Sequence, residues 1–237
     1  LVLGEKLHQQ MGTRRLMEFL TQYQLPLELA ALLRRAYGDV ALEVVKANPY
    51  LLVSEEFEVD FSQADGLALA LGVGAEDPLR LEAGLLFELA HNNYNNGHTF
   101  LPRRKLVGAA STLLEVSGEL LEDSLEALIR RGEAECEQVA GQEAVYLPAL
   151  YEAEAYIARR ILEMSRAELL PPQGLDKLIR RIEREQRISY APQQRAAVEL
   201  AAGRQVMLLT GGPGTGKTTC LRGVLALFEM MGLTTAL

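Results

Sequence analysis

The opening part of the chain carries apolar residues at helical spacing. Such residues, repeated every three or four positions, form one face of an α-helix. The positions concerned are Leu16, Phe19, Leu20 and Tyr23. A short break is expected at residues 24–27, and a second helix over residues 28–37 ends at Gly38, a natural C-cap. The pattern predicts short helices joined by tight hairpins.

The same pattern continues through the next thirty or so residues. Asp39 is expected to cap a third helix, which stops before Asn48-Pro49 because the residue before a proline avoids helical angles. Residues 61–71 are expected to form the second helix of another such pair, with Ser62 available as its cap. The sequence therefore predicts helix-hairpin-helix units at the N-terminal end.

Asp77-Pro78 begins a new helix, because Asp is a good N-cap and proline is tolerated at the first helical position. An Asn-rich segment at residues 91–99 is expected to be a loop, and Pro102 to start another helix. After Gly118 comes a helix over residues 119–131. The apolar positions of the first of these helices are Leu81, Leu85, Leu86 and Leu89.

Two short strand-like arms flank Ala140-Gly141 in residues 134–148, which is a hairpin signal. Two helices followed by a hairpin is the order of a winged helix. A further helix is expected from Ala149 to about Met164, and Pro171-Pro172 marks a domain boundary.

The expected fold is mainly α and multidomain. A helix-hairpin-helix region covers residues 1–74, a helical, winged-helix-like domain residues 75–170, and a linker with a glutamine motif residues 171–200. Residues 201–237 form the truncated start of an α/β, RecA-like P-loop domain.

The motif with the clearest chemistry is GGPGTGKTT at residues 211–219, which satisfies the pattern GxxxxGK[ST] of a phosphate-binding P-loop. An apolar run at residues 206–209 suits a buried parallel strand before it, and an apolar stripe after it suits a helix. Strand, glycine loop and helix is the setting that a P-loop needs. The expected phosphate-binding residues are Gly211, Gly212, Pro213, Gly214, Thr215, Gly216, Lys217, Thr218 and Thr219.

Each residue type has a physical role in such a loop. Glycines allow successive backbone amides to point at phosphate oxygens, and the following helix adds the positive end of its dipole. Lys217 is expected to reach the β- and γ-phosphates of ATP, and the Thr218 hydroxyl to bind Mg²⁺. Thr219 is expected to support the loop. The plain alternative is a glycine-rich turn without a ligand, which would not require Lys-Thr at the helix start.

Composition adds few constraints. The net charge of −8 argues against a uniformly basic coat for nucleic acid, although local patches can still bind it. No apolar run is long enough to span a bilayer and no signal peptide is recognisable, so we expect a cytoplasmic protein without membrane contact. The chain starts without methionine and stops soon after the P-loop, which indicates a piece of a longer protein.

Residues 190–201, YAPQQRAAVELA, together with GGPGTGKTT resemble the first two nucleotide-binding motifs of superfamily-one DNA helicases. The segments ANPYLL, FSQADGLALALGV and GHTFLP, at residues 47–52, 61–73 and 97–102, narrow the resemblance to RecD-like helicases, relatives of the exodeoxyribonuclease V alpha subunit. The resemblance covers nearly the whole chain.

This resemblance implies an ATP-dependent helicase that moves 5′ to 3′ along single-stranded DNA and acts in repair or recombination. It implies that Gln194 contacts adenine, for which the alternative is an ordinary surface glutamine on an amphipathic helix. The part present here is expected to bind nucleotide weakly and not to hydrolyse it, because the acidic residue that later strands supply is missing.

The expected DNA-binding surfaces carry the wrong charge. Residues 58–61, EVDF, stand where the family has a Gly-Ile-Gly-Phe turn, and their carboxylates would repel phosphate. The second helix of the winged-helix candidate is similarly acidic, at Glu119, Glu122, Asp123 and Glu126. We therefore favour a structural or protein-contacting role for the N-terminal region over DNA binding.

Two basic clusters remain, at residues 103–105 and 180–187. The second is interleaved with Glu183 and Glu185, which favours a solvated face over phosphate contact. Two other functions stay open: an AAA-type ATPase with an N-terminal helical module, and a non-enzymatic protein-interaction module.

Overall fold

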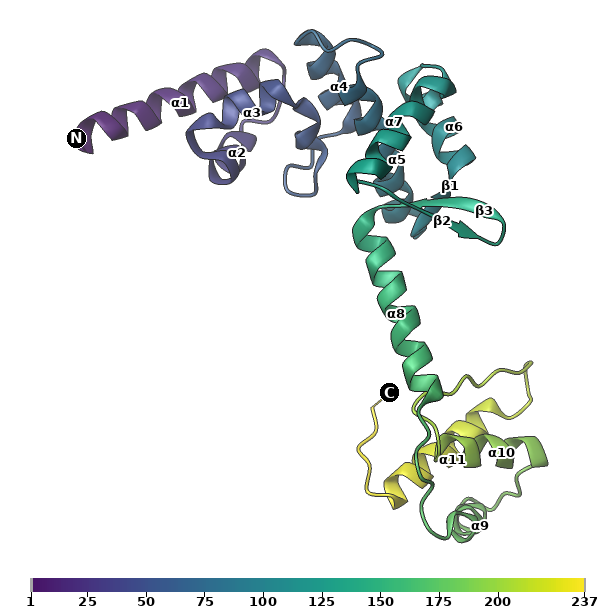
Figure 1. The fold of residues 1–237 in the computed structure, drawn as a ribbon. Helices are drawn as coiled ribbons and strands as arrows, with labels where there is room; N and C mark the ends of the chain where they lie inside the picture. Colours follow the sequence, from purple (N-terminus) through teal and green to yellow (C-terminus); the bar gives the residue numbers. More distant parts are fainter. Residues whose placement is uncertain (1, 237) are drawn as a thin grey trace. The chain divides into compact units, whose positions relative to one another are not determined.

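The computed structural model describes the backbone of residues 2–236 and the side chains of residues 11–236. The chain forms two compact units, Leu1–Glu152 and Ala153–Leu237. Helices dominate both of them (Figure 1), which confirms the mainly α class.

The first unit begins with short helices joined by tight turns. Gly38 closes the second of them with a φ of 64°, as predicted. Two of the predicted N-caps, Asp39 and Ser62, are wrong. Asp39 accepts a hydrogen bond from Arg34 instead of capping a helix, and Ser62 lies inside a helix that Asp60 precedes, because buried Phe61 fixes where that helix starts. The elements are α1 (Val2–Gln22), α2 (Leu29–Tyr37), η1 (Gly38–Val40), α3 (Ala41–Ala47), η2 (Pro49–Val53) and α4 (Phe61–Ala70).

Two similar bends support the helix-hairpin-helix prediction. Gln24 and Glu58 both adopt left-handed backbone angles, with φ of 57° and 53°. Leu25 and Val59, the residues that follow them, are buried. Their amides donate to the carbonyls of residues 20 and 52 over 2.9 and 3.1 Å, so each bend is fastened to the preceding helical segment. The hairpin shape is thus present at both places without glycine.

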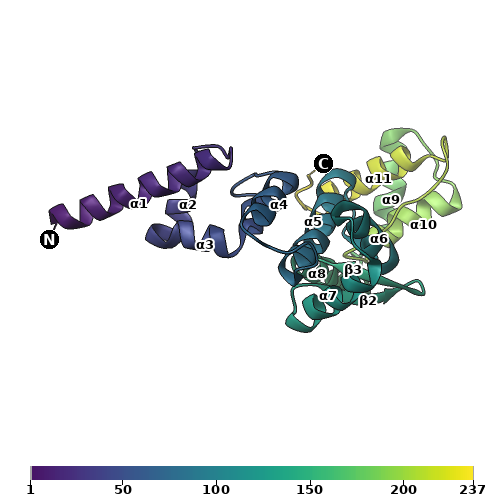
Figure 2. The same cartoon turned by 90° about the horizontal axis from the view of Figure 1, so that it is seen from above.

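The winged-helix prediction is confirmed. Three helices and three antiparallel strands follow one another, and the strands lie in the order β1-β3-β2. Figure 2 shows the β2–β3 hairpin near α6 and α7. The elements are α5 (Pro78–Asn96), β1 (Phe100–Pro102), α6 (Arg103–Leu114), α7 (Gly118–Arg131), β2 (Glu135–Val139) and β3 (Gln142–Tyr146). Strand β1, which the sequence did not predict, pairs Leu101 with Val145.

The Asn-rich segment is helical as far as Asn96, so the loop expected at residues 91–99 is wrong over most of its length. Its amide side chains bond within the helix. Asn92 donates to the Glu88 carbonyl over 2.9 Å, and Asn95 donates to the His91 carbonyl over 3.1 Å. Gly97, with a φ of 65°, ends the helix instead.

The predicted hairpin turn is confirmed. Ala140 and Gly141 have φ of 52° and 79°, which is the pair of positive values that a two-residue type I′ turn requires. The start of α5 also follows the prediction, since the Asp77 carboxylate accepts from the Leu79 amide over 2.9 Å.

A buried ion pair joins α4 to α5. Arg80 donates to Asp65 through Nε and Nη2, both over 2.8 Å, and its Nη1 donates to the carbonyls of Ala75 and Leu114 over 3.0 Å. Tyr50 donates to the same carboxylate over 2.7 Å. Burial, followed by this hydrogen bond, raises the pKa of the Tyr50 phenol. One hydrophobic core extends through the helix-hairpin-helix and winged-helix parts of the unit.

The second unit is helical, with a smaller core of its own. The strand expected at residues 206–209 does not form, and Leu208 is 87% exposed. A strand needs a neighbour to satisfy its backbone, and among the described residues no other strand lies beside this segment. The helices are α8 (Pro148–Arg166), which continues from the first unit, α9 (Leu175–Gln186), α10 (Pro192–Ala201) and α11 (Lys217–Met230).

Candidate nucleotide-binding site

The glycine-rich segment forms an exposed loop that leads directly into α11. Gly216 is the N-cap of this helix, with a φ of 86°, and Gly214 has a φ of 75°. Both angles favour glycine. Gly211, Gly212 and Pro213 are exposed in the same loop. The helix expected after the loop is confirmed, and the first turn of an α-helix leaves backbone amides without partners inside the helix.

Lys217 folds back over the loop. Its ammonium group donates to the carbonyls of Gly211 and Gly212 over 2.5 and 2.7 Å. The Thr215 hydroxyl also donates to the Gly212 carbonyl, over 2.9 Å. A single positive charge is therefore held inside the curve of the loop, on the first residue of α11.

The two threonines after the lysine lie on the first turn of the same helix. Thr218 is exposed and Thr219 is half-buried. The Thr218 hydroxyl is thus open to solvent beside the loop, whereas Thr219 is turned partly toward the protein.

The structure brings Gln194 to the loop. Its side-chain oxygen accepts from the Ala191 amide over 3.1 Å, and its amide nitrogen donates to the Thr215 carbonyl over 3.2 Å. A side chain at position 216 would collide with this amide group. Gln194 therefore links the start of α10 to the glycine loop, and its contact with adenine stays a prediction.

Sequence reasoning did not predict the role of Tyr190, which lies in the core that joins α10 to α11. Its ring is buried against Gly223 of α11 and Val198 of α10. Burial raises the pKa of its phenol, and the hydroxyl has no hydrogen-bond partner among the described residues. The only available signal was an aromatic residue just before the proline that starts α10.

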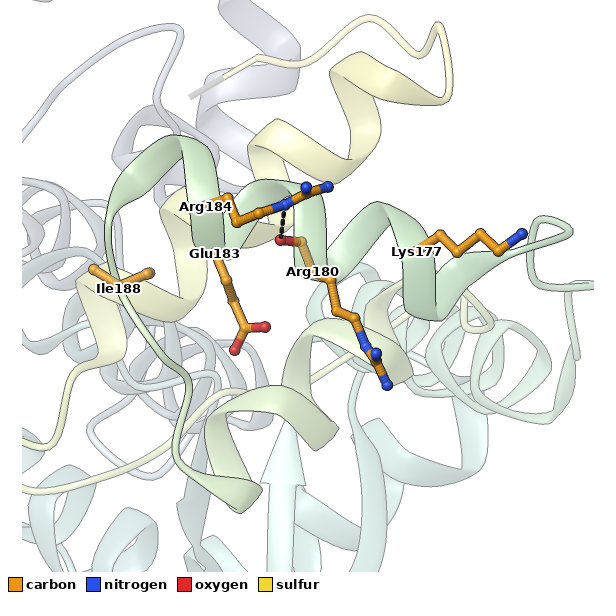
Figure 3. A pocket seen from close by; sticks show the side chains of 5 residues that line it. All are labelled: Lys177, Arg180, Glu183, Arg184 and Ile188. Atoms are coloured by element: carbon orange, nitrogen blue, oxygen red, sulfur yellow. Dashed lines mark hydrogen bonds between the residues drawn. The ribbon is translucent and has the colours of Figure 1, made fainter.

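A cationic face lies nearby on α9. Figure 3 shows Lys177, Arg180 and Arg184 on this helix, with Arg184 donating to the Arg180 carbonyl over 3.4 Å. Arg180 pairs with Asp176 over 2.9 Å, and the neighbouring Arg181 pairs with Glu185 over 2.7 Å. Such interleaved pairs are typical of a solvated helix face.

The other basic cluster is partly neutralised within the first unit. Arg103 contacts Glu122 and Glu126 of α7 over 2.7 and 2.6 Å. Its guanidinium therefore faces the acidic helix of the winged-helix part, whereas Arg104 and Lys105 are exposed.

Comparisons with known proteins agree with this organisation. Residues 9–100 match the family model of the ATP-dependent RecD2 DNA helicase helix-hairpin-helix domain, and residues 194–236 match an AAA domain. The class is thus a helix-hairpin-helix chain that continues into an AAA-domain segment. Over most of its length the chain is similar to a RecD2 DNA helicase.

The relative that shows this is the ATP-dependent RecD2 DNA helicase of Deinococcus radiodurans. The two are 29% identical over 234 residues, which cover 93% of this chain and 32% of the relative. The chain thus spans about a third of the length of the curated relative it matches. Across the described residues, no helix combines the length and apolar character that a membrane crossing requires.

Proposed function

We propose that this chain binds ATP and Mg²⁺ within an ATP-dependent DNA helicase. The observation that carries the proposal is the glycine loop at the head of α11, which holds the Lys217 ammonium inside its curve and is tied to Gln194. Relationship to a RecD2 helicase supports DNA as the polymer on which the protein acts.

The residues present fit a nucleoside triphosphate. In the proposal, the amides of Gly212 to Lys217 surround the phosphates, because glycine angles and a helix start favour an anion there. Lys217 leaves the carbonyls of its own loop and neutralises phosphate charge. Thr218 binds Mg²⁺ through its exposed hydroxyl, and Gln194 contacts adenine.

The wider function is part of the same proposal. We infer movement 5′ to 3′ on single-stranded DNA, in repair or recombination, by a protein of the cell interior. In this proposal the four-part division predicted from sequence holds, and residues 201–237 contribute the nucleotide site of a RecA-like motor.

Replacement of the lysine tests the nucleotide site. We expect Lys217→Ala to weaken binding of a fluorescent ATP analogue with Mg²⁺ by roughly ten- to a hundredfold, because a charged hydrogen bond is lost. Fluorescence titration of the 237-residue chain measures this, with exposed Lys105→Ala as the matched control. Equal affinity in both variants would refute the site.

The helicase assignment needs a separate test, in the protein as the cell makes it. We expect Lys217→Ala to abolish both ATP hydrolysis and unwinding of a duplex with a 5′ single-stranded tail. Unwinding that survives the substitution would contradict the proposed role of this site.

An AAA-type ATPase is the second candidate, because residues 194–236 match a model described only as an AAA domain. The helix-hairpin-helix match at residues 9–100 favours the helicase. In the protein as the cell makes it, stimulation of ATP hydrolysis by single-stranded DNA distinguishes the two, since the second candidate predicts a hydrolysis rate that DNA does not change.

A further inference from the structure

An apolar groove runs along the first unit, whereas the glycine loop belongs to the second. It has a volume of about 590 Å³ and lies between η2 with its following loop and one side of α5. This volume falls in the range of roughly 300 to 1,000 Å³ that is usual for ligand sites. Its apolar lining includes Leu51, Val53, Leu79, Ala83, Leu86 and Phe87.

Aromatic rings follow one another along the groove. Ring centroids are 5.8 Å apart between Tyr50 and Phe61, 4.7 Å between Phe61 and Phe87, and 5.3 Å between Phe87 and His91. Tyr94, one turn further along α5, is 88% exposed and also lines the groove. A large aromatic side chain left in water beside an apolar groove is typical of a surface that another molecule covers.

One side of the groove is lined by Glu55, which belongs to an acidic loop. Glu56, Glu58 and Asp60 follow within the same loop. Among the described residues, the structure shows no ion pair for any of these four carboxylates.

Another part of the lining is acidic to a smaller degree. Glu82 and Glu133 line the groove there, and both contact Arg131, over 2.7 and 2.6 Å. The three side chains together carry one net negative charge. No lysine or arginine is among the lining residues described for the groove.

The charges beside the groove indicate which kind of molecule binds in it. Phosphates of a nucleic acid would meet repulsion from these carboxylates, although the rings themselves could stack on bases. We propose that the groove docks a segment of a partner protein in which apolar side chains are flanked by Lys or Arg. The apolar side chains enter between η2 and α5, and the cations face the loop that carries Glu55.

A peptide pair tests the proposal on the 237-residue chain. The probe is a fluorescent peptide of about twelve residues with Leu and Phe anchors flanked by Lys, and its partner carries Glu in place of every Lys. We expect measurable binding of the Lys-flanked peptide alone, and a loss of about tenfold or more in affinity with Tyr94→Ala, since exposed aromatic anchors are frequent hot spots. Glu55→Lys is expected to weaken binding of the same peptide, because the new lysine repels the lysines of the peptide.

Two matched variants test whether the loss of any exposed tyrosine, or any such change of charge, would have the same effect. Tyr156→Ala deletes another exposed tyrosine and Glu137→Lys makes the same charge change on β2, and both should bind like the parent chain. All four positions are exposed, and circular dichroism checks that each variant is folded.

Several results would overturn the proposal. They are equal binding of the two peptides, no binding of either, or equal losses in the Tyr94→Ala and Tyr156→Ala variants. Binding of an oligo-thymidine of about twenty nucleotides that Tyr94→Ala abolishes would also overturn it, by making the groove a nucleic-acid site.

Discussion

Asp65 is the residue on which the polar interior of the first unit depends. Its carboxylate receives two bonds from Arg80 and one from Tyr50. The side chains of Arg80 and Asp65 are only 8% and 14% exposed. Removing one member of such a pair leaves the other charged and buried, which costs more than the intact pair contributes.

We therefore expect Asp65→Asn to lower the free energy of unfolding by about 3 kcal/mol. Urea denaturation measures this. The control is Asp39→Asn, at a surface pair whose carboxylate is 63% exposed. That change should cost less than about 1 kcal/mol. A similar loss in both variants would mean that the buried pair has no special weight.

At the scale of elements, the contact between α10 and α11 depends on the absence of a side chain. A Cβ atom on Gly223 would meet the Tyr190 ring, with Cζ at 2.9 Å, and the Val198 methyl group at 3.2 Å. Tyr190 precedes α10 and Gly223 lies in α11, so the two helices pack through this position.

Gly223→Ala is expected to destabilise the second unit by about 1 to 3 kcal/mol, because the added methyl group overpacks the contact. Gly108→Ala is the matched control, since its added Cβ would meet nothing within 4 Å in α6. Alanine is the better helix former, so the control should be neutral or stabilising. Thermal unfolding followed by circular dichroism compares them, and an unchanged Gly223→Ala variant would contradict the packing argument.

Local signals determined which elements could be predicted from sequence. Asp77-Pro78 and Ala140-Gly141 act within a few residues, and both gave the right structure. Strand β1 depends on pairing with β3, forty-odd residues later, and the strand expected at residues 206–209 depends on neighbours that the described chain does not place beside it. Sequence spacing could not reveal either condition.

The candidate site likewise has one part that the sequence predicted and another that only the structure shows. The glycine loop and its lysine were readable as a motif, because every residue of it is contiguous. The bond from Gln194 to the Thr215 carbonyl and the packing of Tyr190 against Gly223 join residues that are distant in sequence. These contacts required the three-dimensional structure.

At the scale of the whole molecule, the chain contains two separate hydrophobic cores. The first extends through the helix-hairpin-helix and winged-helix parts. Among the described residues, the buried members of the second are Ile179, Ile182, Tyr190, Val198, Ala201, Ala202, Val224 and Leu227. A smaller core buries less apolar surface per residue and gives a less stable unit.

We expect two unfolding transitions in calorimetry, with the second unit melting first. ATP with Mg²⁺ should raise the midpoint of that transition alone, because a ligand stabilises the unit that binds it. Lys217→Ala supplies the control, in which the ligand should have little effect. A single unfolding transition whose midpoint rises with ATP and Mg²⁺ would contradict the independence of the two cores.

The bends at Gln24 and Glu58 imply that this chain stores backbone strain. A left-handed angle costs a residue with a side chain roughly 1 to 2 kcal/mol, and glycine would adopt it freely. Such a conformation persists only when its surroundings over-determine it. Here Leu25 and Val59, buried immediately after each bend, supply that constraint, so the hydrophobic core holds both hairpins in a shape that their own residues disfavour.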